Sequence, residues 1–170
     1  MALFRKRIDA QEAQQRLLTI VMTTVSGDER LTKGYSDGDI AGGRDRLRAE
    51  FCALRLFAVL VASKQTRYQD WQERGRELFD QLFESTLKSV MSENGEPEIL
   101  AREWLEEAVK YYGLSTHIAA SLDDLGTEVG EGFRIVLSEA PSDALARLGR
   151  GVFFRAFDQT LAMYANMKLA

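Results

Sequence analysis

The longest apolar run of the chain predicts a buried central helix. Between residues 51 and 62 only Arg55 interrupts the apolar side chains. Strands rarely exceed about ten residues, so an apolar run of this length favours a helix. Apolar residues cover nearly its whole circumference, which is typical of a buried helix rather than a surface helix. We therefore expect a central helix over about residues 44–64, with the other helices packed around it.

Apolar residues at helical spacing predict further helices on both sides of this run. The expected ranges are 9–25, 67–91, 97–113, 115–125 and 142–167. Residues 26–43 and 126–141 are predicted to be irregular. Within the second region, residues 133–137 are predicted to form a helical turn or an extended segment. The chain shows no internal repeat and no linker. The sequence therefore predicts an all-α fold, in which about six or seven helices form a single domain over residues 9–170.

Glycines are expected to end or bend several of these helices. Gly113 and Gly126 are predicted helix ends. The glycine-rich segment 126–132 lacks the Lys-Ser/Thr pair of a phosphate-binding loop and carries two glutamates, so it predicts a flexible loop. Gly149 and Gly151 lie inside the last expected helix, where they indicate a kink or a close contact with another helix.

The first eight residues predict a flexible basic arm. Arg5, Lys6 and Arg7 follow Phe4, and Asp9 is the expected N-cap of the first helix. A solvated tail is the preferred interpretation. The alternative is an arm that contacts a membrane surface or an acidic partner.

Composition and charge exclude several classes of function. The net charge is −4, and it divides into +2 for residues 1–90 (15 Lys and Arg, 13 Asp and Glu) and −6 for residues 91–170 (7 and 13). An acidic chain is not expected to bind nucleic acid. No apolar segment is long enough to span a membrane. One cysteine, Cys52, allows no internal disulfide, which favours the cytoplasm.

The sequence contains no recognisable catalytic or metal-binding arrangement. His117, Ser121 and Asp124 share a helix face, but a hydrolytic triad needs the histidine between the other two. A single histidine and a single cysteine do not form a zinc site. The segment 37–48 begins like a calcium-binding loop and then lacks two of the required oxygen ligands. We therefore expect no catalytic residue, no metal and no cofactor.

Two functional hypotheses remain, and the first is preferred. It is a non-enzymatic protein-interaction module, acting as an adaptor, a chaperone-like protein or a regulator. Trp104, Tyr111 and Tyr112 lie beside many glutamates and are the candidate partner face. The partner is another protein or a second copy of the chain, since halves of opposite charge favour a homodimer.

The second hypothesis is a binder of a small hydrophobic ligand, with or without enzymatic activity. Phenylalanines at helical spacing would line a cavity between helices: Phe57, Phe79, Phe83, Phe153, Phe154 and Phe157. Arg55 or His117 would be the polar anchor for the ligand. A fully packed interior would argue against this hypothesis.

Overall fold

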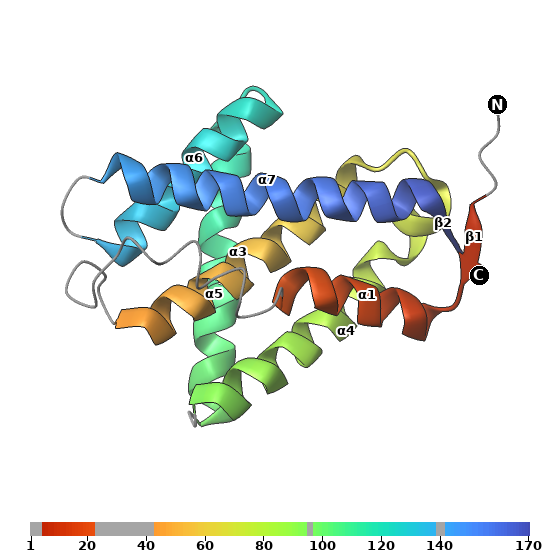
Figure 1. Cartoon of the computed structure of the whole chain (residues 1–170), viewed down its shortest axis with the longest axis horizontal. Coiled ribbons are helices and arrows are strands. Elements are labelled where there is room, and N and C mark those ends of the chain that lie inside the picture. Colours follow the sequence, from red (N-terminus) through yellow and green to blue (C-terminus); the bar gives the residue numbers. More distant parts are fainter. Residues whose placement is uncertain (1–4, 23–42, 95–96, 139–141) are drawn as a thin grey trace.

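The computed structural model describes residues 5–22, 43–94, 97–138 and 142–170 (Figure 1). The elements are β1 (Lys6–Ile8), α1 (Ala10–Met22), α3 (Gly43–Gln65), α4 (Gln69–Asn94), α5 (Glu98–Ile118), α6 (Leu122–Leu137), α7 (Asp143–Asn166) and β2 (Met167–Leu169). The predicted all-α bundle is confirmed, with six helices packed together in the described part of the chain. None of these helices is both long enough and apolar enough to cross a membrane.

Helix α3 is the buried centre of the bundle, as the sequence predicted. It contacts every other described helix, and most extensively α7. Phe51, Leu54 and Phe57 are almost completely buried along it, and even its Glu50 and Arg55 are buried. An apolar circumference is required here because α3 has neighbours on all sides. The other helices therefore take their positions from α3.

Helices α6 and α7 pack so closely that glycines are required at their interface. A Cβ atom at Gly130 would lie 2.4 Å from the carbonyl oxygen of Ala146, and one at Gly149 would lie 2.6 Å from the Cβ of Phe133. The helix end predicted at Gly126 and the flexible loop predicted over 126–132 are therefore wrong, because α6 runs through both. Glycine costs helix propensity, but here it allows the two backbones to approach.

Helix α5 also continues past its predicted end. It runs through Gly113 to Ile118, so the separate helix predicted over 115–125 does not exist. Helix α6 begins instead after Ser121, whose hydroxyl accepts a hydrogen bond from the backbone N–H of Asp124 at 3.1 Å. This is the usual N-cap arrangement. Ser121 and Asp124, which the sequence placed on one helix face with His117, thus form the start of α6, whereas His117 lies in α5.

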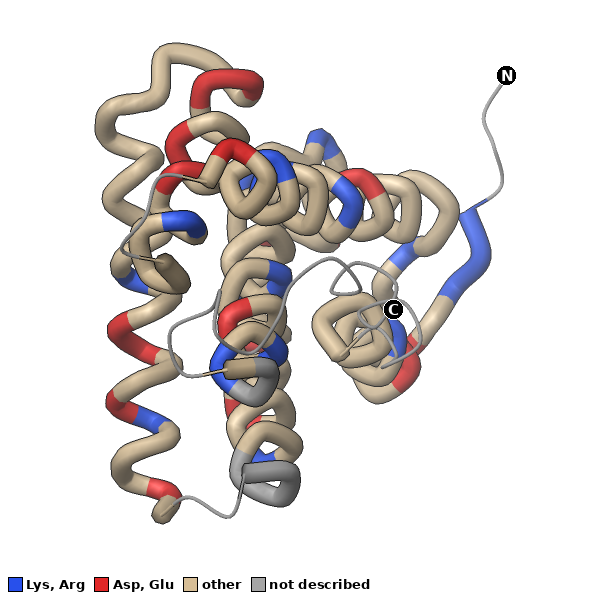
Figure 2. Tube along the Cα trace, turned by 60° about the vertical axis from the view of Figure 1, so that its left-hand side comes forward, with Lys and Arg blue, Asp and Glu red and all other residues tan. Residues whose placement is uncertain are grey.

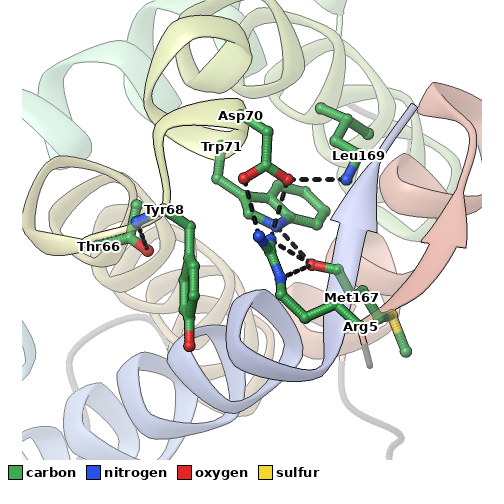
Figure 3. A network of polar contacts seen from close by, with 7 residues as sticks. All are labelled: Arg5, Thr66, Tyr68, Asp70, Trp71, Met167 and Leu169. Carbon is green, nitrogen blue, oxygen red and sulfur yellow. Dashed lines mark hydrogen bonds and ion pairs between the residues drawn. The ribbon is translucent and has the colours of Figure 1, made fainter. Parts of the chain in front are cut away.

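The two ends of the described chain are joined in a network that we call the terminal clasp (Figure 3). Strand β1 pairs in parallel with β2, with Lys6 opposite Met167. The guanidinium of Arg5 donates to both carboxylate oxygens of Asp70 at 3.1 and 2.9 Å. The carbonyl oxygen of Met167 accepts hydrogen bonds from Arg5 Nε and Trp71 Nε1, each at 2.9 Å.

The clasp differs from the loose arm that the sequence predicted for residues 1–8. Residues 1–4 lie outside the described part of the chain, but Arg5 to Ile8 are held against α4 and β2. Asp70 also accepts a hydrogen bond from the backbone N–H of Leu169 at 2.9 Å. Burial acts to raise the pKa of Asp70, but the hydrogen bonds from Arg5 and Leu169 outweigh it, so that this pKa is below its usual value. Arg5 therefore forms its ion pair with a carboxylate of its own chain, Asp70.

The loop predicted over residues 26–43 lies outside the described residues, apart from Gly43 at the start of α3. The same is true of residues 139–141 in the second region predicted to be irregular.

Candidate functional site

An open groove lies between α4 and α5, with α3 as its floor. Figure 1 shows α4 and α5 meeting where one ends and the other begins, and then diverging. The groove has a volume of about 1300 Å³. Its apolar lining comes from four helices: Phe57, Leu60, Val61, Phe79, Phe83, Val109, Leu114, Leu122 and Leu125. The divergence of two helices thus leaves apolar side chains of the bundle accessible from outside.

An ion pair closes the end of the groove where α4 and α5 come together. The guanidinium of Arg102 donates to the two carboxylate oxygens of Glu84 at 2.7 and 2.8 Å. This bidentate contact holds the pKa of Glu84 below its usual value. Arg102 also contacts Glu98, one turn earlier on α5, at 3.4 Å. The pair links the two helices at the surface and sets where their separation begins.

The rim of the groove is polar and carries charges of both signs. Lys64, Lys110 and His117 lie on it together with Asp80 and Glu106. The side chain of His117 is exposed, near the end of α5. An apolar floor with a mixed charged rim is the usual anatomy of a protein-binding surface. His117, which the sequence singled out, therefore belongs to this rim.

Helix α5 carries a second apolar face, which points away from the core. Leu100, Tyr111, Leu114 and Ile118 are among its exposed side chains, and Leu114 and Ile118 are 57% and 70% exposed. A different face of the helix is buried through Ala101, Leu105 and Tyr112. Almost all the large exposed apolar side chains of the described residues lie on α5, and Ile135 of α6 is the exception. Large exposed apolar side chains that share one helix face are typical of an interaction site.

A buried polar cluster fixes α5 on the central helix. The hydroxyl of Tyr112 donates to Glu50 Oε2 at 2.9 Å, and Arg46 Nη2 lies 2.9 Å from Glu50 Oε1. The guanidinium of Arg46 also lies over the ring of Trp104, 5.1 Å from its centroid. Burial raises the pKa of Glu50, and it raises the pKa of Tyr112 well above the usual value, with the charge of Glu50 adding to the effect. The cluster positions α5 so that its other face remains outside.

The structure separates the three aromatic residues that the sequence placed on one partner face. Tyr112 is buried in the cluster just described, and Trp104 is half-buried beside Arg46. Only Tyr111 is exposed, and its ring lies next to Gly132 of α6. Tyr112 and Trp104 therefore secure α5, and aliphatic residues near both ends of the helix form most of its exposed apolar surface.

Arg55 lies away from the groove. It is 5% exposed, its Nη1 donates to the carbonyl oxygen of Val21 at 3.4 Å, and its guanidinium lies 5.3 Å from the ring centroid of Phe51. The groove lining does not include it. Among the two polar anchors that the sequence offered for a ligand, only His117 reaches the groove.

The predicted phenylalanine cavity is found in part. Phe57, Phe79 and Phe83 line the groove, whereas Phe153, Phe154 and Phe157 do not. Phe153 stacks on Phe57 with ring centroids 5.9 Å apart, beneath the floor. The sequence missed Leu114 and Ile118 because Gly113 was interpreted as a helix end. Their spacing from Tyr111, three and seven residues, was the signal that would have found them.

Acidic side chains follow α5 and the start of α6 (Figure 2). Glu103, Glu106 and Glu107 lie in the first half of α5, and Lys110 and His117 in the second half. The charge of this helix is therefore divided along its length.

No family model, no curated protein and no solved structure matches the chain. The geometry of α5 and of the groove beside it is what supports a function.

Proposed function

We propose that the protein is a non-enzymatic helical interaction module that binds an apolar helix of another protein in the groove between α4 and α5. An adaptor, a chaperone-like protein and a regulator would all use such a groove. The observation that carries the proposal is the groove itself, with its volume of about 1300 Å³ and its apolar lining from four helices. Amphipathic helices bind to grooves of this kind through apolar side chains at helical spacing.

The rim supports a peptide occupant over a purely apolar one. Lys64 and Lys110 lie on it, and the described residues form no ion pair with either. Asp80 and Glu106 provide opposite charge nearby. An amphipathic helix presents polar side chains along both edges of its apolar stripe, and these edges would meet the rim. The partner thus needs an apolar stripe flanked by charges of both signs.

A glycine in the wall of the groove allows a direct test. Gly113 lines the groove, and a Cβ atom there would meet nothing within 4 Å. Gly113→Leu should fill part of the groove and also raise helix propensity, which favours stability by about 1 kcal/mol. We expect labelled amphipathic model helices of acidic, basic and mixed polar faces to bind the wild-type protein and to lose affinity for this variant. Fluorescence anisotropy measures the binding, and urea denaturation measures the stability.

The matched control is Gly151→Leu on α7, which also meets open space and does not line the groove. It should gain similar stability and bind the model helices like the wild type. Equal binding by both variants, or no binding of any model helix to the wild type, would reject the groove as a helix-binding site.

A small hydrophobic ligand is the second candidate occupant of the same groove. The observation in its favour is the share of apolar side chains in the lining, including Phe57, Phe79 and Phe83. Pockets for small ligands usually measure about 300–1,000 Å³ and enclose most of the ligand, so this larger open groove favours a helix. Saturable binding of a long-chain fatty acid that displaces every model helix would reverse the preference.

Location and the exclusion of nucleic acid remain predictions. A cytoplasmic protein is expected because the single cysteine, Cys52, is buried and forms no disulfide. Nucleic acid is not an expected partner because the net charge is −4.

A further inference from the structure

The outer face of α5 has the spacing of a coiled-coil seam. Leu100, Glu107, Tyr111, Leu114 and Ile118 form what we call the outer stripe. With half-buried Trp104 between the first two, these positions are separated alternately by four and three residues, which is the heptad spacing of helices that pack side by side. The single charge in the stripe, Glu107, lies near its middle. Nothing in the described part of the chain covers Leu100, Leu114 or Ile118, which remain more than half exposed.

The stripe is complementary to itself when one copy is reversed. If two α5 helices lie antiparallel around an axis near residue 109, Leu100 faces Ile118 of the second copy. Trp104 then faces Leu114, and Glu107 faces Tyr111, whose hydroxyl is a hydrogen-bond donor. The two apolar ends of the helix therefore cover each other, and Glu107 obtains a polar neighbour. A parallel pairing would instead place the two Glu107 side chains against each other.

The charges along α5 favour the same antiparallel arrangement. With the axis near residue 109, Lys110 is level with Glu106 and Glu107 of the second copy to within about one helical turn, 5.4 Å measured along the helix axis. His117 lies within a similar distance of Glu103 of the second copy. The two Lys110 side chains flank the axis between glutamates of both copies. Opposite charges beside an apolar seam fix the orientation of paired helices.

On these grounds, and resting on the proposed function of an interaction module, we propose that the outer stripe of α5 binds a second copy of this chain, with the two α5 helices antiparallel. The interface is isologous, so both copies contribute the same residues. Ile135 of α6, which is 55% exposed, follows Gly132, the neighbour of Tyr111, by three residues. The groove lies on a neighbouring side of α5 and shares only Leu114 with the stripe.

Sedimentation velocity over a range of concentrations tests the association. We expect the full chain to form dimers as its concentration rises. Leu100→Glu combined with Ile118→Glu should abolish the dimer, and Glu107→Leu should tighten it by at least tenfold because it replaces the charge in the seam. Ile99→Glu, equally exposed on α5 but outside the stripe, is the matched control and should leave the dimer intact. A wild-type protein that stays monomeric at every accessible concentration overturns the proposal.

Cross-linking tests the antiparallel orientation. Leu100→Cys and Ile118→Cys are made separately, with the native cysteine changed by Cys52→Ser. Positions 100 and 118 are about 27 Å apart along one helix, so a disulfide between copies needs the reversed pairing. We expect covalent dimers on oxidation only when the two variants are mixed. Efficient cross-linking of either variant with itself would contradict the antiparallel arrangement.

The groove proposal and the dimer proposal can be rejected independently of each other. Gly113→Leu alters the groove and leaves the outer stripe untouched, so it should abolish binding of the model helices while the dimer persists. The stripe variant Leu100→Glu/Ile118→Glu should do the reverse. A dimer with the expected cross-link and no helix binding in the groove would retain the dimer proposal and reject the groove proposal.

Discussion

Two pairs of consecutive helices in this bundle are packed in opposite ways. Helices α6 and α7 approach until a Cβ atom at Gly130 would collide with a backbone carbonyl. Helices α4 and α5 meet at one end, where Arg102 and Glu84 join them, and then diverge around a groove. The first pair has glycines between its backbones, and the groove of the second pair is lined by Phe79 and Phe83. The side chains at the crossing decide whether a helix pair closes or leaves a surface for binding.

The contrast indicates where this protein keeps its stability and where it presents a site. At the closed pair the apolar side chain of Phe133, which lies against Gly149, is completely buried, and substitutions there act on folding. At the open pair the apolar side chains are accessible, and substitutions there act on binding with a smaller cost in stability. The five predictions below test this contrast.

The largest effect is expected from matched phenylalanine truncations. Phe133 of α6 is completely buried and stacks on Phe51, with ring centroids 5.6 Å apart. Phe133→Ala should lower the free energy of unfolding by about 4 kcal/mol, the usual cost of a cavity in a packed core. Phe83→Ala, at the groove wall, should cost only about 1 kcal/mol because that side chain is already part open. Urea denaturation of both variants measures the ratio, and equal costs would show that the groove is packed shut in solution.

The next effect tests the close approach of α6 and α7. Gly130→Ala places a methyl group against the carbonyl oxygen of Ala146 and should cost about 3 kcal/mol, because a backbone atom has little room to move. Gly151→Ala is the control on α7, where a Cβ atom meets open space, and it should stabilise by about 1 kcal/mol. Thermal or urea unfolding distinguishes the two. A neutral Gly130→Ala would mean that the helices lie farther apart.

A medium effect is expected at the cluster that holds α5 against α3. Glu50→Ala should cost about 2 kcal/mol because it leaves the buried hydroxyl of Tyr112 without its acceptor. Tyr112→Phe is the control for the loss of the hydrogen bond alone and should cost less than Glu50→Ala. Equal stability of Glu50→Ala and the wild type would show that the cluster does not anchor the helix.

The same residue predicts a dependence on pH. Burial raises the pKa of Glu50 in the folded state, so the folded protein binds this proton more tightly than the unfolded chain does. The resulting stabilisation is fully present below the unfolded pKa, about 4.3, and is lost as the pH rises through the higher folded value. Glu50→Gln stays neutral, so the stability of the wild type should fall relative to this variant over that pH window. A constant difference between them would contradict the raised pKa.

The smallest effect is expected at the surface ion pair between α4 and α5. Arg102→Ala removes its bidentate contact with Glu84, and both side chains are partly open to solvent, so the stability should change little and the change should vanish in high salt. The Arg102→Ala substitution should instead change the affinity of the groove for a model helix. Glu77→Ala, farther along α4, is a control whose carboxylate does not contact α5. A large loss of stability in Arg102→Ala would place this pair among the main supports of the fold.

The parts of the fold that depend on local pattern were predictable. The central helix follows from one apolar run, and α4 and α7 follow from amphipathic stripes at helical spacing. Helix α6 was not predictable because Gly126, Gly130 and Gly132 are poor helix formers by themselves. Gly126 and Gly130 are approached by α7, and Gly132 is approached by Tyr111 of α5, and these contacts exist only in the folded chain.

The candidate site was less accessible from the sequence than the fold. Phe57, Phe79 and Phe83 were expected to meet in a cavity, but the groove depends on the angle between two helices, which no local pattern encodes. The exposed ends of α5 were missed for a simpler reason. Gly113 resembles a helix end, whereas α5 continues past it to Ile118.

The terminal clasp imposes an order on how the chain folds as it is made. Strand β1 is the first described element to leave the ribosome, and its partner β2 is the last. The hydrogen bonds of Trp71 with Met167 and of Asp70 with Leu169 likewise form only after the last described strand has been made. Contacts this distant in sequence form late and slowly. Helix α7, which makes the most extensive contact with the central helix, is also made late. The nascent chain must therefore keep the central helix partly uncovered until α7 has been made, which makes this interval the time of greatest exposure to aggregation and to chaperones.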